Sequence, residues 1–279
     1  MKLRKAIVVA LAAAATSVSS AATFDVSTPA EFQTALTTAQ ANGEPDSINV
    51  AAGTYDLTTT LTYTAPASEN FSLVIDGTDS DAVVLNGNAQ VPILRIDTTA
   101  VTNDSGVFVE VRNMTFGAGN ASGTPADGGA LAITMFDGNQ PFEFASLVLV
   151  RGCEFYQNSA DGNGGAVYIR SPAVEGIYLD DLTFEDNSAG GTGGGAYVEG
   201  RFLGTPIELN NIDFFSNTAQ DSGGGLYAGG YDADTPGANR ANSISLNDIS
   251  FAGNQSLGTT AADGGVDSGL TADSRAVGG

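Results

Sequence analysis

The stretch GIYLDDLTFEDNSAGGTGGGAYVEG, residues 176–200, is followed closely by a near copy of itself, PIELNNIDFFSNTAQDSGGGLYAGG, residues 206–230. Both copies contain alternating apolar residues, then Phe-x-x-Asn, a short polar loop and a run of glycines. Repetition at a spacing of about 30 residues is typical of solenoid proteins, in which each repeat stacks on its neighbours. This repeat therefore decides the fold.

Aligning the chain on phenylalanine gives five copies, centred on Phe116, Phe155, Phe184, Phe214 and Phe251. The residues seven, five and two positions before each phenylalanine are apolar in every copy, as Ile177, Leu179 and Leu182 are in the third. The residues between them are mostly polar. This period of two predicts a β-strand with one buried face in each copy.

The alternation slips once, three residues before each phenylalanine. Only Asn, Gly and Asp occupy that column, the residues that best tolerate a positive φ. We therefore expect a sharp corner there that turns one strand into the next. The corner residues are Asn113, Gly152, Asp181, Asn211 and Asp248.

Two more signals follow each phenylalanine. An asparagine comes three residues later in four copies (Asn158, Asn187, Asn217 and Asn254), and in the first copy Phe116 reaches Asn120. Glycine pairs then precede another short strand, and we align Gly128-Gly129, Gly164-Gly165, Gly194-Gly195, Gly224-Gly225 and Gly264-Gly265. The asparagines are expected to form amide ladders between coils, and the glycines to permit a tight entry into the third strand.

Three short strands per coil predict a parallel β-helix. The less regular segments 72–77, 82–87 and 92–97 are interpreted as early coils. A capping box at Thr28, Pro29 and Glu31 starts a short amphipathic helix that would cover the open end of the core. The predicted organisation is a secretory leader at 1–22 and a single β-helix domain at 23–279. That domain comprises a cap helix at 28–42, irregular early coils at 45–110 and regular coils at 107–270.

The leader has a basic start, an apolar run and small residues before the expected cleavage after Ala22. Its removal takes away three of the ten basic residues, so the mature chain carries 7 − 32, or −25, against −22 for the whole chain. We expect a secreted, periplasmic or cell-surface protein that binds no nucleic acid and inserts into no membrane.

The residues that the chain lacks exclude several mechanisms. It has no histidine, and both lysines lie in the leader. Ser-His-Asp and Cys-His catalysis, lysine Schiff bases and histidine-bearing zinc sites are therefore excluded. The single cysteine, Cys153, falls in an apolar column and is interpreted as a buried thiol.

The motifs F-x-x-N and G-G-A-x resemble the repeats of the chlamydial polymorphic outer-membrane proteins. The chain is also similar to exported bacterial right-handed β-helix repeat proteins with a pectate-lyase-like fold, and this resemblance implies a right-handed parallel β-helix. The first motif is present at 155–158, 184–187, 214–217 and 251–254, and the second is clearest at 128–131, 164–167 and 194–197. The resemblance to the chlamydial family implies surface display and adhesion. The enzymes of the wider fold cleave acidic polysaccharides.

Several residues are candidates for chemistry. Asp180, Asp181 and Asp213 lie in adjacent coils, where paired carboxylates can serve glycoside hydrolysis, but Asp181 stands in the corner column, which favours a structural role. Arg112 and Arg151 share a column, and a lyase would need one of them as a base. The candidate ligand face is formed by two stacked tyrosines and two arginines beyond the third strand: Tyr197, Tyr227, Arg170 and Arg201.

No cofactor is required by these patterns, but calcium remains open as a ligand of the acids before the glycines, Asp127, Asp161, Asp221 and Asp263. The sequence favours a non-catalytic structural, adhesive or surface-binding protein. A polysaccharide lyase or glycoside hydrolase working in a groove is the alternative. A second alternative is a filament subunit that associates end to end. Expected partners are extracellular polysaccharides, cell-surface components or another copy of the chain.

Overall fold

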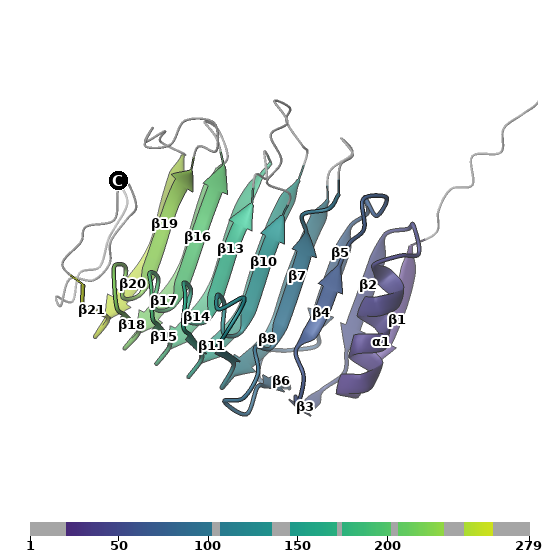
Figure 1. Cartoon of the computed structure of the whole chain (residues 1–279), viewed down its shortest axis with the longest axis horizontal. Coiled ribbons are helices and arrows are strands. Elements are labelled where there is room, and N and C mark those ends of the chain that lie inside the picture. Colours follow the sequence, from purple (N-terminus) through teal and green to yellow (C-terminus); the bar gives the residue numbers. More distant parts are fainter. Residues whose placement is uncertain are drawn as a thin grey trace, which may run out of the picture.

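The computed structural model describes residues 21–101, 107–135, 146–171, 175–201, 206–231 and 243–258. Within these ranges the chain forms three parallel β-sheets and one helix, stacked along one long axis (Figure 1). In the regular coils, each turn of the chain adds one strand to every sheet. The predicted all-β parallel β-helix with a short N-terminal helix is confirmed. Residues 1–20 of the predicted leader lie outside the described residues, whereas its last residue, Ala22, is the first residue of β1.

The first sheet is the longest. In spatial order it contains β1 (Ala22–Val26), β2 (Asp46–Val50), β5 (Leu73–Gly77), β8 (Phe108–Gly117), β11 (Leu147–Tyr156), β14 (Gly176–Glu185), β17 (Ile207–Phe215) and β20 (Ile244–Ala252). Two short strands, β3 (Gly53–Asp56) and β6 (Val83–Asn86), extend it beside the second half of β8.

The other two sheets follow the same stacking order. The second sheet comprises β4 (Leu61–Thr64), β7 (Leu94–Thr98), β10 (Leu131–Met135), β13 (Val167–Ser171), β16 (Ala196–Arg201) and β19 (Leu226–Tyr231). The third comprises the two-residue strands β9 (Asn120–Ala121), β12 (Ser159–Ala160), β15 (Ser188–Ala189), β18 (Thr218–Ala219) and β21 (Gln255–Ser256).

Like residues stack on like in the core. Val148 pairs with Ile177, and Ile177 pairs with Ile207, all three fully buried. The repeated phenylalanines form a continuous stack, with successive ring centroids 4.7 to 5.1 Å apart and ring planes within 12° of parallel. The apolar columns of the sequence are therefore rows of contacts along the axis of the β-helix.

The early coils differ from the prediction. The segments at 72–77, 82–87 and 92–97 provide the strands β5, β6 and β7 of a single coil, not a series of coils. A short apolar run marks a strand, but it does not indicate which sheet the strand joins. The pairing of β8 makes the arrangement clear, because its first half pairs with β5 and its second half with β6.

The helix α1 (Pro29–Ala39) closes the N-terminal end of the core. Its residues Phe32 and Leu36 face the core and are fully buried. Thr28 caps the helix by accepting a hydrogen bond from Glu31 N at 3.2 Å. The Glu31 carboxylate accepts from Ser27 N at 2.9 Å, one residue earlier than an ordinary capping box requires.

The same helix also occupies the free edge of the second sheet. Gln33 accepts a hydrogen bond from Thr62 N at 2.8 Å and donates one to Thr62 O at 3.0 Å. Gln40 accepts from Thr64 N at 3.1 Å. The glutamine amides thus take the place of a neighbouring strand along β4, and a further strand cannot pair there while α1 is in position.

Candidate functional site

The corner column adopts one backbone conformation throughout. Its five members have φ between 51° and 58°, in the left-handed region that Asn, Gly and Asp tolerate. The corner side chains point outward, where Asn113 donates to Asp76 Oδ1 at 2.8 Å and Asn211 donates to Asp181 Oδ1 at 2.9 Å. Their role is to turn the strand while the apolar side chains on both sides remain inside.

The asparagines after the phenylalanines form a buried ladder. Asn187 donates through Nδ2 to Phe155 O in the preceding coil at 3.0 Å and to Asn217 Oδ1 in the following coil at 2.9 Å. Its own Oδ1 accepts from the backbone N and the Nδ2 of Asn158, at 2.9 and 3.0 Å. The amide is therefore fully used in joining three coils.

The first step of this ladder differs from the prediction. Gly119, not Asn120, stands at the ladder position, and its backbone N donates to Asn158 Oδ1 at 2.8 Å. Asn120 lies in β9 and donates to Ala89 O at 3.1 Å. A glycine suffices because the first position needs only a backbone donor, so the expected asparagine is not required there.

A second left-handed column escapes sequence analysis. The residue before each ladder position has φ between 51° and 68°, and its identity changes in every copy: Ala118, Gln157, Asp186, Ser216 and Gly253. No residue type marks this column. The signal that locates it is its fixed place, between the phenylalanine and the ladder residue.

The glycine alignment needs a one-residue correction in two copies. Strand pairing aligns Val167 with Ala196 and Ala196 with Leu226, so Gly193 and Gly223, not Gly194 and Gly224, correspond to Gly164. The first glycine of each pair has a φ between 65° and 75°, which explains why glycine is needed there: Gly128, Gly164, Gly193 and Gly223. The triple glycines concealed this register, since two alignments fit them equally well. The pair Gly264-Gly265 lies outside the described residues.

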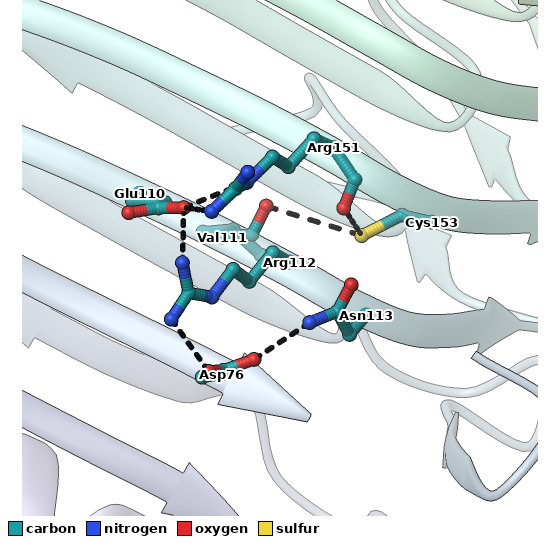
Figure 2. Close-up of polar contacts among 7 residues, drawn as sticks. All are labelled: Asp76, Glu110, Val111, Arg112, Asn113, Arg151 and Cys153. Carbon is teal, nitrogen blue, oxygen red and sulfur yellow. Dashed lines mark hydrogen bonds and ion pairs between the residues drawn. The ribbon is translucent and has the colours of Figure 1, made fainter. Parts of the chain in front are cut away.

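A compact group of charges covers the outer face of the first sheet near β8 (Figure 2). Arg112 lies 2.7 Å from Asp76 Oδ2 and 2.9 Å from Glu110 Oε1. Arg151, stacked on Arg112 in the next coil, reaches the same Glu110 oxygen at 2.8 Å. The hydrogen bond from Arg112 to Asp76 raises the pKa of the guanidinium, which opposes the role of base that a lyase would give it. The charges of the two arginines and the two carboxylates in this group therefore cancel.

The candidate acids do not form a catalytic pair. Asp181 pairs in register with Asn211, whereas Asp213 pairs with Thr183, so the two carboxylates occupy different columns. Asp180 lies opposite Arg151 and Asn210 on neighbouring strands. Asp180 and Asp181 are exposed, and Asp213 accepts a hydrogen bond from the Ser250 hydroxyl.

The tyrosine column contains one more member than predicted. Tyr168 stacks on Tyr197 at 5.2 Å, and Tyr197 stacks on Tyr227 at 4.8 Å, with ring planes within 10° of parallel. The off-by-one glycine alignment hid Tyr168. Because the rings cover one another face to face, Tyr197 presents no open ring face on which a sugar could stack.

The charged part of the candidate ligand face is also engaged. Arg170 lies 3.3 Å from Glu199 across β13 and β16. Burial, followed by the charge of Glu199, raises the pKa of Tyr197. Arg201 ends β16, but its side chain lies outside the described residues. These contacts hold the tyrosine stack in place along the second sheet.

Comparison with known families agrees with this geometry. Three segments match the Chlamydia polymorphic membrane protein repeat: residues 152–170, 181–199 and 211–229. Each match begins at a corner residue with positive φ, and the three last residues, Arg170, Glu199 and Gly229, pair with one another in register.

These three segments of the chain are similar to the Chlamydia polymorphic membrane protein repeat. Each matched repeat runs from the corner through the phenylalanine, the ladder asparagine and the glycines into the second sheet. No curated protein and no solved structure matches the chain significantly.

The loops of the matched repeats and of the coil before them use their acids and amides to contact one another. Asp127 Oδ1 accepts from Asn163 N at 2.7 Å, and Asn163 Oδ1 accepts from Thr192 N at 2.9 Å. Arg95 donates to Asp127 O at 3.0 Å, which brings a positive charge to the place where calcium would bind. In the described ranges no group of three or more acidic or cysteine residues is arranged to hold a metal ion. Asp263 is outside those ranges.

Cys153 lies at the start of the first matched repeat. It is buried and unpaired with another cysteine, and burial raises its pKa to about 12. Its Sγ contacts the carbonyl oxygens of Val111 and Arg151 (Figure 2). A thiol with this pKa is a poor nucleophile.

Among the described residues, no helix combines the length and apolar character needed to cross a membrane.

Proposed function

We propose that this chain is an exported, non-catalytic β-helix protein with a structural, adhesive or surface-binding role. One observation carries the proposal: the polar residues that recur in the matched repeats are bonded to neighbouring coils. Asn187 is the clearest example, because both ends of its amide join adjacent coils. The repeat therefore specifies a scaffold.

Export is proposed from the leader expected at residues 1–22. The strand β1 begins at Ala22, whose backbone N donates to Pro45 O at 2.8 Å. Cleavage after Ala22 would remove this residue and its hydrogen bond, so β1 of the exported chain would begin at Thr23. The matched repeats are named for membrane proteins of Chlamydia, which agrees with a role at or outside the cell surface.

A binding role places the ligand on an outer face of the sheets. The net charge of −22 favours neutral or basic partners over acidic polysaccharides, which it would repel. The candidates are neutral glycans and basic patches of cell-surface proteins. A filament could not grow by strand pairing at the edge of β4 while α1 is in position, because Gln33 already bonds that edge.

Binding and turnover should be measured on the same preparation of the mature chain. We expect retention on a neutral glycan array or on intact cells, together with no release of sugar from neutral or acidic polysaccharides in calcium-containing buffer. Sustained turnover that is lost in Asp180→Asn or Arg112→Gln would establish the enzyme alternative. Mass that rises with concentration in light scattering would instead favour the filament alternative.

A further inference from the structure

Two buried carboxyl groups meet where the helix α1 passes into the first sheet. Asp46 is the first residue of β2 and is 4% exposed, and Glu69 lies in the turn between β4 and β5 and is 2% exposed. Carboxylates are rarely this buried without a positive partner. The arginine ion pairs found in the described ranges involve Asp76, Glu110 and Glu199 instead.

Both carboxyls are attached to the same short turn. Asn42 donates through Nδ2 to Asp46 Oδ1 at 2.7 Å, and Gly43 N donates to Glu69 Oε2 at 3.1 Å. The other oxygen of Glu69, Oε1, is buried without a hydrogen-bond partner. The turn follows α1 directly, so the protonation state of these two carboxyls affects the residues that hold the helix over the core.

The surroundings add negative charge. Glu44, in the same turn, acts on both carboxyls, and the two carboxyls in turn add to burial in raising the pKa of Tyr63 of β4. Burial raises the pKa of Asp46 to about 6 against the hydrogen bond from Asn42, which lowers it, and the charges of Glu69 and Glu44 add to the rise. Burial also raises the pKa of Glu69 against the hydrogen bond from Gly43 N, and the charge of Glu44 adds to the rise. Two ionised carboxylates at this place would therefore destabilise the folded N-terminal end.

We propose that Asp46 and Glu69 form a proton-controlled lock on the N-terminal cap. In mildly acidic medium a proton on the pair keeps the turn at 42–44 and the helix α1 in place. Ionisation of both groups at higher pH loosens α1, and the edge of β4 that Gln33 and Gln40 cover becomes available to a neighbouring strand.

The sign of the pH dependence follows from the direction of the pKa shifts. The folded-state pKa of Asp46 lies above its unfolded value, so its contribution to stability is complete below about pH 4 and is lost as the pH rises through about 6. Wild-type protein should unfold at a lower temperature at about pH 7.5 than at about pH 5, by roughly 3–6 °C.

Thermal unfolding of the mature chain at these two pH values tests the lock. Asp46→Asn and Glu69→Gln keep the shape of the side chains but cannot ionise, so each should raise the midpoint at about pH 7.5 and flatten its pH dependence. The matched control is Glu185→Gln, which removes one charge from an exposed position on β14 and should retain the wild-type dependence. Equal pH dependence in all four proteins would overturn the proposal.

Amide exchange in the wild-type protein provides a readout that needs no variant. Corrected for intrinsic rates, protection of the Thr62 and Thr64 amides should fall between about pH 5 and about pH 7.5, while the Asn187 amide in the ladder keeps its protection. Constant protection at Thr62 and Thr64 contradicts the lock. A calcium-dependent rise in the unfolding midpoint that Glu69→Gln abolishes also contradicts it, because a cation would then neutralise the pair.

Discussion

The early coils at 46–98 and the regular coils at 108–256 turn the chain at their corners in different ways. In the regular coils a single residue such as Asp181 turns the corner, and an asparagine such as Asn187 satisfies the backbone behind it. In the early coils the corners are connections at 51–52 and 78–82. There a tyrosine hydroxyl contacts the backbone instead, since Tyr55 Oη lies 2.8 Å from Ala51 O and 3.1 Å from Val26 O and can donate its one hydrogen to either carbonyl.

The difference reflects what each region must do. A ladder side chain needs an equivalent neighbour, so it suits coils that repeat. The first coils have a helix on one side and a coil on the other, and their contacts cannot be periodic. The ladder also has a direction, because it can begin at a glycine N–H, as at Gly119, whereas Asn158, Asn187 and Asn217 each donate to the asparagine that follows. The regular region is therefore built for extension and the early region for closure.

The largest expected effect separates the two regions at the ladder. Asn187→Leu leaves Phe155 O and the donors of Asn158 without partners inside the core, so the free energy of unfolding should fall by about 4 kcal/mol. Urea unfolding measures the loss. Asn210→Ala removes an exposed amide that bonds Asn247 and should cost under about 0.5 kcal/mol. A similar cost for both would mean that the ladder is not a special source of stability.

In the early region the corresponding test is Tyr55→Phe. The ring stays buried, but Ala51 O loses its nearest side-chain donor, whereas Val26 O keeps the hydrogen bond from Ala51 N at 2.9 Å; we expect a loss of about 2 kcal/mol in urea unfolding. Tyr178→Phe is the control, because the Tyr178 hydroxyl donates to Glu175 O in an exposed contact. If Tyr55→Phe costs no more than the control, the early backbone must be satisfied by other groups.

The corner gives a smaller effect whose sign depends on the substitution. At Asp181, where φ is 55°, valine should destabilise the fold by about 1.5 kcal/mol, since a β-branched residue is strained in the left-handed region. Glycine at the same position should be close to neutral. Equal unfolding midpoints for Asp181→Val and Asp181→Gly would show that the corner backbone relaxes, and that the Asn, Gly and Asp pattern has another cause.

The comparison also explains which features could be predicted from sequence. Where coils repeat, each position is sampled several times, so the apolar columns, the corner at Asp181 and the ladder at Asn187 stand out against changing neighbours. The register of the glycines failed because a run such as Gly193-Gly194-Gly195 has no internal landmark. The Asp46–Glu69 pair and the contacts of Gln33 were missed because they join segments far apart in sequence and occur once. Periodicity reveals what is repeated, whereas unique contacts need coordinates.

The smallest expected effect on stability concerns the closed end. Gln33→Ala removes both hydrogen bonds to Thr62 but favours the helix intrinsically, so the net loss should be about 1 kcal/mol or less. Its clearer consequence is an unpaired stretch of β4 at Thr62, while Gln40 still bonds Thr64 N. This stretch should make the protein associate as its concentration rises in light scattering. The control Thr34→Ala lies on the same helix, where the threonine hydroxyl bonds Ala30 O within α1. Because this control leaves Gln33 on the edge, it should stay at constant mass. Association in both variants would trace the effect to a weakened helix, and association in neither would mean that Gln40 or other contacts are enough to protect the edge.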